Sequence, residues 1–400
     1  MIYFIKMKVC FETFGCRLNK AEALQMEADY LADGWEVTAK HSDANLFVVR
    51  GCSVTARAQS ECEKLIAHLR RRYPAAGIKV CGCLKSTDSP QTVKRLGNRT
   101  IEQSNNRTIP PLPLRTARAY LKVQDGCAGK CTFCIVPKFR GESRSEPFTD
   151  LLDRAKRFID AGYHEIVVTG CNLSLYASEG KRLPDLVSAL AGLDAGCRIR
   201  LGSLEPGICA QETVHAMAEA PNVCRFLHLP VQSGSNKILK EMRRPYVVED
   251  VEDTVTLASK LMPDLGLGCD LMTGFPGESR LDFAATKGLL KRLPFVHAHV
   301  FPFSERPGTL AAGLPRRLAK DIRSARARLL ADEMRSKRRK FAKTFIGKTV
   351  EIVVEDEKTG RGWTGEYLPC EPLSGSFVRK SVARVFVTKT KGDLLLGNPR

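Results

Sequence analysis

The stretch QDGCAGKCTFCIVPKFRG, residues 124–141, carries the strongest local signal in this chain of 400 residues. Cys127, Cys131 and Cys134 have the spacing C-x3-C-x2-C, shortly after an apolar run over 119–123 that predicts a strand. Three thiols gathered in one loop after a strand indicate a metal site. The strand before them is the first of a series.

Two kinds of metal site suit this loop. A structural zinc ion takes four ligands, and Cys171 is the only obvious candidate for the fourth. A [4Fe-4S] cluster held by three cysteines instead leaves one iron open, and that iron can bind the amino and carboxylate groups of a small molecule. We therefore favour the cluster over zinc.

Six apolar runs, separated by helical stretches, follow one another from the strand before this loop. They cover residues 119–123, 165–169, 198–202, 226–230, 266–272 and 296–301. Six strand-helix repeats of this length predict an α/β barrel, complete or partial, with its chemistry at the carboxyl ends of the strands.

The N-terminal part repeats the same unit three times, with predicted strands at 8–15, 46–49 and 78–80. Cys16, Cys52 and Cys83 each follow one of these strands, beside a glycine. Free cysteines are commonly buried core residues. A parallel sheet, however, gathers the carboxyl ends of its strands at one edge, so the recurring position predicts a second three-thiol site.

The C-terminal part is basic and then rich in strands. Residues 316–343 form a predicted helix with 12 Lys or Arg, and short β-rich runs at 349–354, 362–368, 376–378 and 383–389 predict a small β-barrel. The predicted organisation of the α/β chain is therefore an N-terminal domain over 7–97, a linker over 98–116, a barrel over 117–315, the basic helix, and a β domain over 344–400.

The amino-acid composition indicates what kind of partner the protein binds and in which cellular compartment it works. The formal net charge is +19, which favours a polyanionic partner, above all a nucleic acid. The 15 cysteines are an odd number and too sparse for a disulfide scaffold. No signal peptide or membrane-spanning run is found in the sequence, so we expect a cytoplasmic protein with reduced cysteines and no membrane partner.

The phrases around the cysteines resemble a known family. FGCRLNKAEALQM, RGCSVTARAQ, CGCLKS and QDGCAGKCTFCIVPKFRG are similar to the radical SAM (S-adenosylmethionine) methylthiotransferases, and LHLPVQSGSNKILKEMRRPY, DLMTGFPGES and HVFPFSERPGT extend the resemblance to about residue 315. QDGC, CRFLHLP and KEMRRPY are most similar to the branch that modifies N(6)-threonylcarbamoyladenosine at tRNA position 37, next to the anticodon. The third cysteine phrase departs from the family pattern, and Cys81 is an alternative to Cys83 there.

The resemblance implies two [4Fe-4S] clusters. Cys127, Cys131 and Cys134 would hold the SAM-binding cluster, and the N-terminal triad an auxiliary one. SAM would supply both the methyl group and a 5′-deoxyadenosyl radical, and the hydrogen on carbon 2 of the adenine would be replaced by SCH3. A flavodoxin or ferredoxin would donate electrons, the tail would resemble the tRNA-gripping TRAM domain, and we expect a monomer.

Further site residues are expected from the same resemblance or from their position after a strand. The cofactor candidates are Phe133 near the SAM adenine, Thr169 and Gly170 near the methionine amino group, and Ser203 and Glu205 near the ribose. The substrate candidates are Gln232 and Arg306. Each has an ordinary alternative: a loop aromatic, a strand-ending residue, a turn or a solvated charge.

Three other functions stay open. The same chemistry could act on a ribosomal-protein aspartate or on an isopentenyladenosine-type tRNA nucleoside. A metal-cluster protein that binds RNA without catalysis, such as a redox sensor, is the alternative outside the enzymes.

Overall fold

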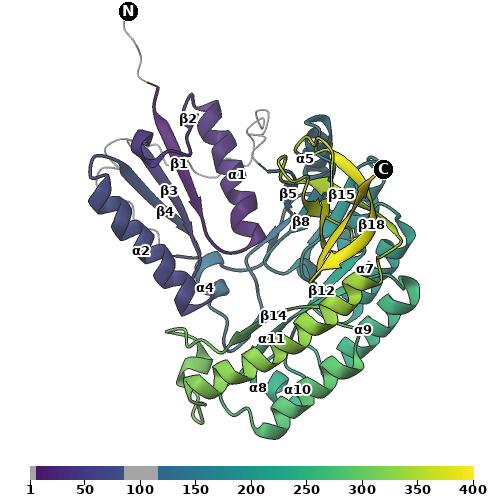
Figure 1. Cartoon of the computed structure of the whole chain (residues 1–400). Coiled ribbons are helices and arrows are strands. Elements are labelled where there is room, and N and C mark those ends of the chain that lie inside the picture. Colours follow the sequence, from purple (N-terminus) through teal and green to yellow (C-terminus); the bar gives the residue numbers. More distant parts are fainter. Residues whose placement is uncertain (1–5, 85–115) are drawn as a thin grey trace, which may run out of the picture.

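The computed structural model describes residues 6–84 and 116–400, so the predicted linker lies outside the described residues except for Thr116. Figure 1 shows three parts along the chain: a purple N-terminal α/β domain, a teal and green barrel domain and a yellow β domain. Within these described ranges, no helix has the length and apolar character needed to cross a membrane.

The N-terminal domain is a four-stranded parallel sheet in the order β2-β1-β3-β4, which confirms the predicted parallel arrangement. Its strands are β1 (Lys8–Thr13), β2 (Glu36–Val37), β3 (Leu46–Gly51) and β4 (Gly77–Gly82). Alternate residues of β3 pack to opposite sides, Phe47 and Val49 with α2 (Ala56–Arg72), and Leu46 and Val48 with α1 (Arg17–Ala32). The short strand β2 was not predicted.

The barrel domain contains two three-stranded parallel sheets, β11-β8-β5 and β12-β13-β14. A parallel bridge between Ser203 and His228 joins them, so the predicted partial (β/α)6 barrel is confirmed. The strands are β5 (Ala119–Lys122), β8 (Glu165–Thr169), β11 (Arg198–Leu201), β12 (Phe226–Gln232), β13 (Gly266–Thr273) and β14 (His297–Pro302). The main helices are α5 (Phe148–Asp160), α6 (Leu183–Ala191), α7 (Ile208–Glu219), α8 (Asn236–Glu241), α9 (Val248–Leu261) and α10 (Arg280–Arg292).

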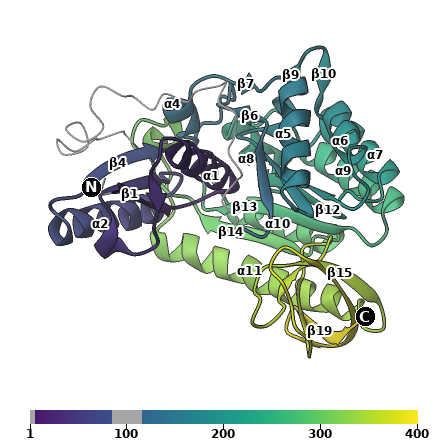
Figure 2. The ribbon, with the colours of Figure 1, turned by 90° about the horizontal axis from the view of Figure 1, so that it is seen from above.

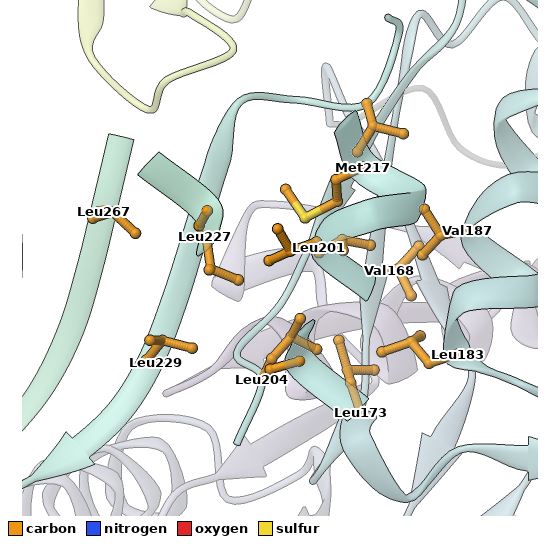
Figure 3. Close-up of a cluster of buried hydrophobic side chains, with 14 of the residues drawn as sticks. Val168, Leu173, Leu183, Val187, Leu201, Leu204, Met217, Leu227, Leu229 and Leu267 are labelled. Carbon is orange, nitrogen blue, oxygen red and sulfur yellow. The ribbon is translucent and has the colours of Figure 1, made fainter. Parts of the chain in front are cut away.

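One face of the barrel strands forms the main hydrophobic core against the helices. Figure 3 shows Leu227, Leu229 and Leu267 projecting from two strands toward the region of Leu201 and Met217. All five side chains are at most 1% exposed. Burying side chains of this size stabilises the fold by about 1.5–3 kcal/mol each.

On β11 the residues between the core positions face the other way and are charged. Arg198 and Arg200 alternate with Ile199 and Leu201 on β11 and contact the C-terminal domain instead of the helices. Arg200 donates to the backbone oxygens of Thr364 and Gly365, at 2.8 and 3.1 Å. Alternation along β11 thus gives it one apolar side that faces the helices and one charged side that the C-terminal domain covers.

The C-terminal domain is a closed barrel in the order β15-β16-β17-β19-β18, as predicted in outline. Its strands are β15 (Thr349–Val354), β16 (Gly362–Trp363), β17 (Pro369–Pro372), β18 (Val382–Lys391) and β19 (Leu394–Pro399). The predicted strand at 376–378 is wrong, because Phe377 folds its ring over Gly360 and Gly375 in a loop. The predicted strand at 362–368 ends early, since the chain turns at Tyr367, whose φ is 66°.

The basic helix α11 (Lys320–Lys343) connects the barrel domain with the C-terminal domain and runs along β14 (Figure 2). Four of its basic side chains form hydrogen bonds with other parts of the protein: Arg323, Arg326, Lys337 and Arg338. Lys337, for example, donates to the backbone oxygen of Leu293 at 2.6 Å. The basic residues of α11 that are exposed, and so contribute charge at the surface, are Lys320, Arg328, Arg335, Arg339, Lys340 and Lys343.

Candidate metal centres

The triad Cys127, Cys131 and Cys134 lies in a loop between β6 (Gln124–Asp125) and the short helix α4 (Val136–Arg140). All three thiols are partly exposed. The backbone N–H of Cys127 donates to the oxygen of Gly141 at 3.0 Å, which closes the loop at its base. Burial raises the pKa of the Cys134 thiol to about 11, so the free thiol is protonated at neutral pH.

A charged pair connects this triad with a predicted cofactor residue. Arg244 donates from Nη1 to Sγ of Cys131 at 3.1 Å and from Nη2 to Oε1 of Glu205 at 2.6 Å. The side chain of Asn172 donates to the other oxygen of Glu205 at 2.7 Å. Glu205, which follows β11, therefore lies beside the triad. Arg244 and Asn172 were not predicted.

The end of β8 lies close to the same loop. A Cβ on Gly170 would lie 3.0 Å from both Oε1 and the backbone oxygen of Gln124, so a larger residue would displace the chain before the cysteines. Thr169 is 4% exposed and accepts a hydrogen bond from the N–H of Val123. Ser203 lies at the junction of the two barrel sheets.

Two further predicted residues have different environments. Phe133 packs edge-on against Phe275, with the ring centres 6.5 Å apart, so it is a half-buried aromatic beside the triad. Gln232 has a φ of 64°, is 6% exposed, and its Oε1 has no hydrogen-bond partner among the described residues. A strained backbone and a buried polar atom without a partner are typical of a position that binds a ligand.

Cys16, Cys52 and Cys83 lie at the carboxyl edge of the N-terminal sheet, after β1, β3 and β4. Gly15 approaches Cys52 so closely that an added Cβ would lie 3.0 Å from its Sγ. Burial raises the pKa of Cys52 and of Cys83, and the electrostatic influence of Cys16 raises both further. The structure therefore brings the three thiols into one region, with Cys16 exposed and the other two buried.

Arg140 contacts this second triad from the barrel domain. Its Nε donates to Sγ of Cys83 at 3.2 Å, and its two other nitrogens donate to Glu22, Asn19 and Asp125 at 2.8–3.0 Å. Sequence analysis assigned no role to Arg140 or Glu22, although both belong to the quoted phrases. Their pairing is invisible in the sequence because 118 residues separate them.

The three thiols of neither triad lie as close together as three ligands of one zinc ion. In the described part of the chain, the groups whose ligand atoms all lie within 4.8 Å are Cys10–Glu12–His41 and His228–Asp270–His299, and neither triad is among them. Two thiolates on one zinc ion lie at most about 4.6 Å apart, twice the Zn–S bond of about 2.3 Å. Cys171, the candidate fourth ligand, contacts Oδ1 of Asp125 at 3.6 Å.

Two other candidates have contacts of their own. Arg306 is 7% exposed and donates to Oε1 of Gln59 on α2, so it is not a solvated surface charge. Cys81, the alternative to Cys83, accepts from Arg50 at 3.5 Å and packs with the α1 side of the sheet. The partners of Arg306 and Cys81 in these contacts are not thiols of the candidate triads.

The group of histidines in the barrel forms a continuous hydrogen-bond chain. Arg338 lies 2.8 Å from Nδ1 of His297, whose Nε2 lies 3.2 Å from Nε2 of His299. His228 and His299 each lie 3.1 Å from Oδ1 of Asp270. Neutral histidines satisfy every one of these contacts, so the group is a polar network that is complete without an ion.

Comparison with known proteins agrees with these sites. The model of the radical SAM superfamily matches residues 121–290, and that of the uncharacterized protein family UPF0004 matches residues 8–101. The solved structure of the radical SAM methyltransferase TsrM from Kitasatospora setae, with cobalamin and a [4Fe-4S] cluster bound, superposes with a TM-score of 0.56. It covers 77% of each chain at 13% identity, which shows a shared fold.

Two curated relatives cover almost the whole chain. The threonylcarbamoyladenosine tRNA methylthiotransferase MtaB of Aquifex aeolicus is 31% identical over 88% of this chain and 93% of its own. The tRNA-2-methylthio-N(6)-dimethylallyladenosine synthase of the same organism is 29% identical over 97% and 98%. The chain belongs to the radical SAM tRNA methylthiotransferase family, whose members use a [4Fe-4S] cluster and SAM and insert a methylthio group.

Proposed function

We propose that this enzyme installs a 2-methylthio group on N(6)-threonylcarbamoyladenosine at position 37 of tRNA. The observation that carries the proposal is the linkage of two thiol triads, one in each α/β domain, through Arg140, which donates to Cys83, and the adjacent Gly141, which accepts from Cys127. One triad would hold the SAM-binding cluster and the other the auxiliary cluster. Bound there, the clusters and SAM would supply electron transfer, sulfur, the methyl group and the radical.

The protein's own residues would bind and orient the reactants. Glu205, Thr169 and Gly170 lie next to the SAM triad at the strand ends, and Phe133 supplies an aromatic face there. Gln232 offers an unpaired amide oxygen to the substrate or SAM. The exposed basic residues of α11 would contact the tRNA phosphates, and their contribution would weaken with salt.

The nucleoside is the finer part of the proposal. The phrases QDGC and KEMRRPY support the threonylcarbamoyl branch, and four of the matched relatives carry that name. A dimethylallyladenosine substrate is the second candidate, because relatives with that name are 27–31% identical.

Nucleoside analysis of tRNA from a strain that lacks the gene tests the proposal. We expect the 2-methylthio derivative of threonylcarbamoyladenosine to disappear and the gene, supplied in trans, to restore it. Loss of only the dimethylallyl product would assign the second candidate. An unchanged nucleoside profile, with a methylthio group missing from a ribosomal-protein aspartate, would overturn both.

A further inference from the structure

Arg140 belongs to the barrel domain but makes its closest polar contacts with the N-terminal domain. It ends α4, six residues after Cys134, and Figure 1 shows this helix between the N-terminal domain and the barrel. Its side chain is 6% exposed. Buried arginines need partners for their donors, and the partners of Arg140 are distributed over both domains.

The charges around Arg140 do not balance by themselves. Three cations, Arg50, Lys122 and Arg140, share the two carboxylates of Glu22 and Asp125. One positive charge is left over in this largely buried group. An uncompensated charge inside a protein is costly, so the group calls for one more anion.

As a ligand of the proposed cluster Cys83 would be a thiolate, and it lies in position to supply that anion. Its Sγ accepts from Nε of Arg140 at 3.2 Å, and its residue is 4% exposed. The remaining nitrogens of the guanidinium are held by Glu22 and Asn19, so the direction of Nε–H is fixed. The side chain of Asn19 in turn donates to the backbone oxygens of Phe14 and Gly51, beside the other two thiols.

We propose that Arg140 is a positioning residue for the auxiliary cluster, fixing the Cys83 sulfur, compensating its charge and tying this triad to the loop of the SAM-binding triad. The link to that loop is direct, because Gly141, the next residue, accepts from the N–H of Cys127. This inference rests on the proposed second cluster. Hydrogen bonds to cluster sulfurs and a nearby positive charge raise a cluster's reduction potential, so the loss of Arg140 lowers it.

The test uses the full chain with Cys127, Cys131 and Cys134 all replaced by alanine, so that only the auxiliary site can hold iron. In this background we compare Arg140→Gln and Arg140→Lys with a matched control, Arg50→Lys. Arg50 also pairs with Glu22, but its sulfur contacts are Met26 and Cys81. The measurements are iron content, extraction rate by a chelator, and a redox titration followed by electron paramagnetic resonance.

We expect Arg140→Gln to give a more negative potential and about tenfold faster iron extraction. Arg140→Lys keeps the charge and gives an intermediate potential, and it carries the comparison if the glutamine variant does not fold. Arg50→Lys keeps the parent values. Equal shifts in the Arg140 and Arg50 variants, or no shift in either, would overturn the role of Arg140. A parent protein without iron would instead refute the second cluster.

Discussion

Nε of Arg200 donates to Oε1 of Glu165 at 2.7 Å, and both side chains are completely buried between the barrel and the C-terminal domain. Arg198 and Arg118 also pair with Glu165, at 2.5 and 3.6 Å. Arg200 continues to Thr364 of the β domain. Glu165 therefore pairs with three arginines at the junction of the two domains.

Replacing Glu165 by glutamine should destabilise this junction. The variant leaves three arginines without their shared carboxylate, and breaking a buried ion pair costs about 3–5 kcal/mol. Urea unfolding measures the loss, and limited proteolysis should release the β domain faster. Glu212→Gln is the control, because its ion pair with Arg182 is exposed and is worth at most about 1 kcal/mol. Similar losses in both variants would contradict the proposed role of Glu165.

The two triads should lose iron independently. The reconstituted, oxygen-free protein is expected to hold about eight irons per chain. Alanine at Cys127, Cys131 or Cys134 should remove one cluster, and alanine at Cys16, Cys52 or Cys83 the other. Cys81→Ala is the control and should keep all the iron. Iron and sulfide assays with Mössbauer spectra check this, and four irons in the unmodified protein would rule out the second site.

Gly15→Ala should damage the N-terminal triad specifically. Gly15 has a φ of 88°, and an added Cβ would lie 2.9 Å from Cβ of Cys52. Gly34 has a φ of 85° but open space around it, so Gly34→Ala carries the same backbone strain, of about 1 kcal/mol, without the clash. We expect iron loss only in the Gly15 variant. Equal iron in the two variants would show that Gly15 does not shape the site.

The basic residues of α11 should divide into two classes. Arg339 and Lys343 are exposed one turn apart, so replacing both by glutamine should weaken tRNA binding and reduce the salt slope by up to about 2. Arg326 is buried and pairs with Glu278. Arg326→Gln should lower the free energy of unfolding by about 3–5 kcal/mol and leave the slope unchanged. Binding titrations at several salt concentrations measure the slope for each variant. A reduced slope in Arg326→Gln, with an unchanged slope in the double variant, would contradict this division.

His297 should make the fold sensitive to acid. Burial, the charge of Arg338 and the neighbouring His299 and His228 lower its pKa to about 3, although Asp270 acts the other way. Its ordinary value is 6.5, so below that pH the unfolded chain binds a proton that the folded chain does not. The titration of His297 therefore leaves the free energy of unfolding unaffected above pH 6.5 and lowers it as the pH drops toward 3.

At pH 5 this loss amounts to at most about 2 kcal/mol. His297→Asn can still accept from Arg338 but does not titrate, so its unfolding free energy should fall less between pH 7 and pH 5. Urea titrations at both values compare the variant with the unmodified protein. Parallel pH profiles would show that His297 is protonated as easily in the folded state as in the unfolded one.

The sequence by itself determined the local chemistry and the order of the elements. The C-x3-C-x2-C loop, the six barrel strands and the three strand-cysteine units depend on spacing and hydrophobic alternation, which are properties of neighbouring residues. Parallel sheet geometry then brings Cys16, Cys52 and Cys83 to one edge without further information. The strands β2 and β17 have only two and four residues, and β19 contains Gly397 and Pro399, so hydrophobic alternation did not predict them.

Only the tertiary structure decided which charged side chains meet. Arg140 reaches Cys83 across 57 residues and Glu22 across 118, and Arg244 reaches Cys131 across 113. Such pairs form because a buried charge must find an opposite charge or a hydrogen-bond acceptor after the backbone has folded. The same requirement turns four basic residues of α11 inward. The spacing of residues along the chain does not show which charged side chains will pair.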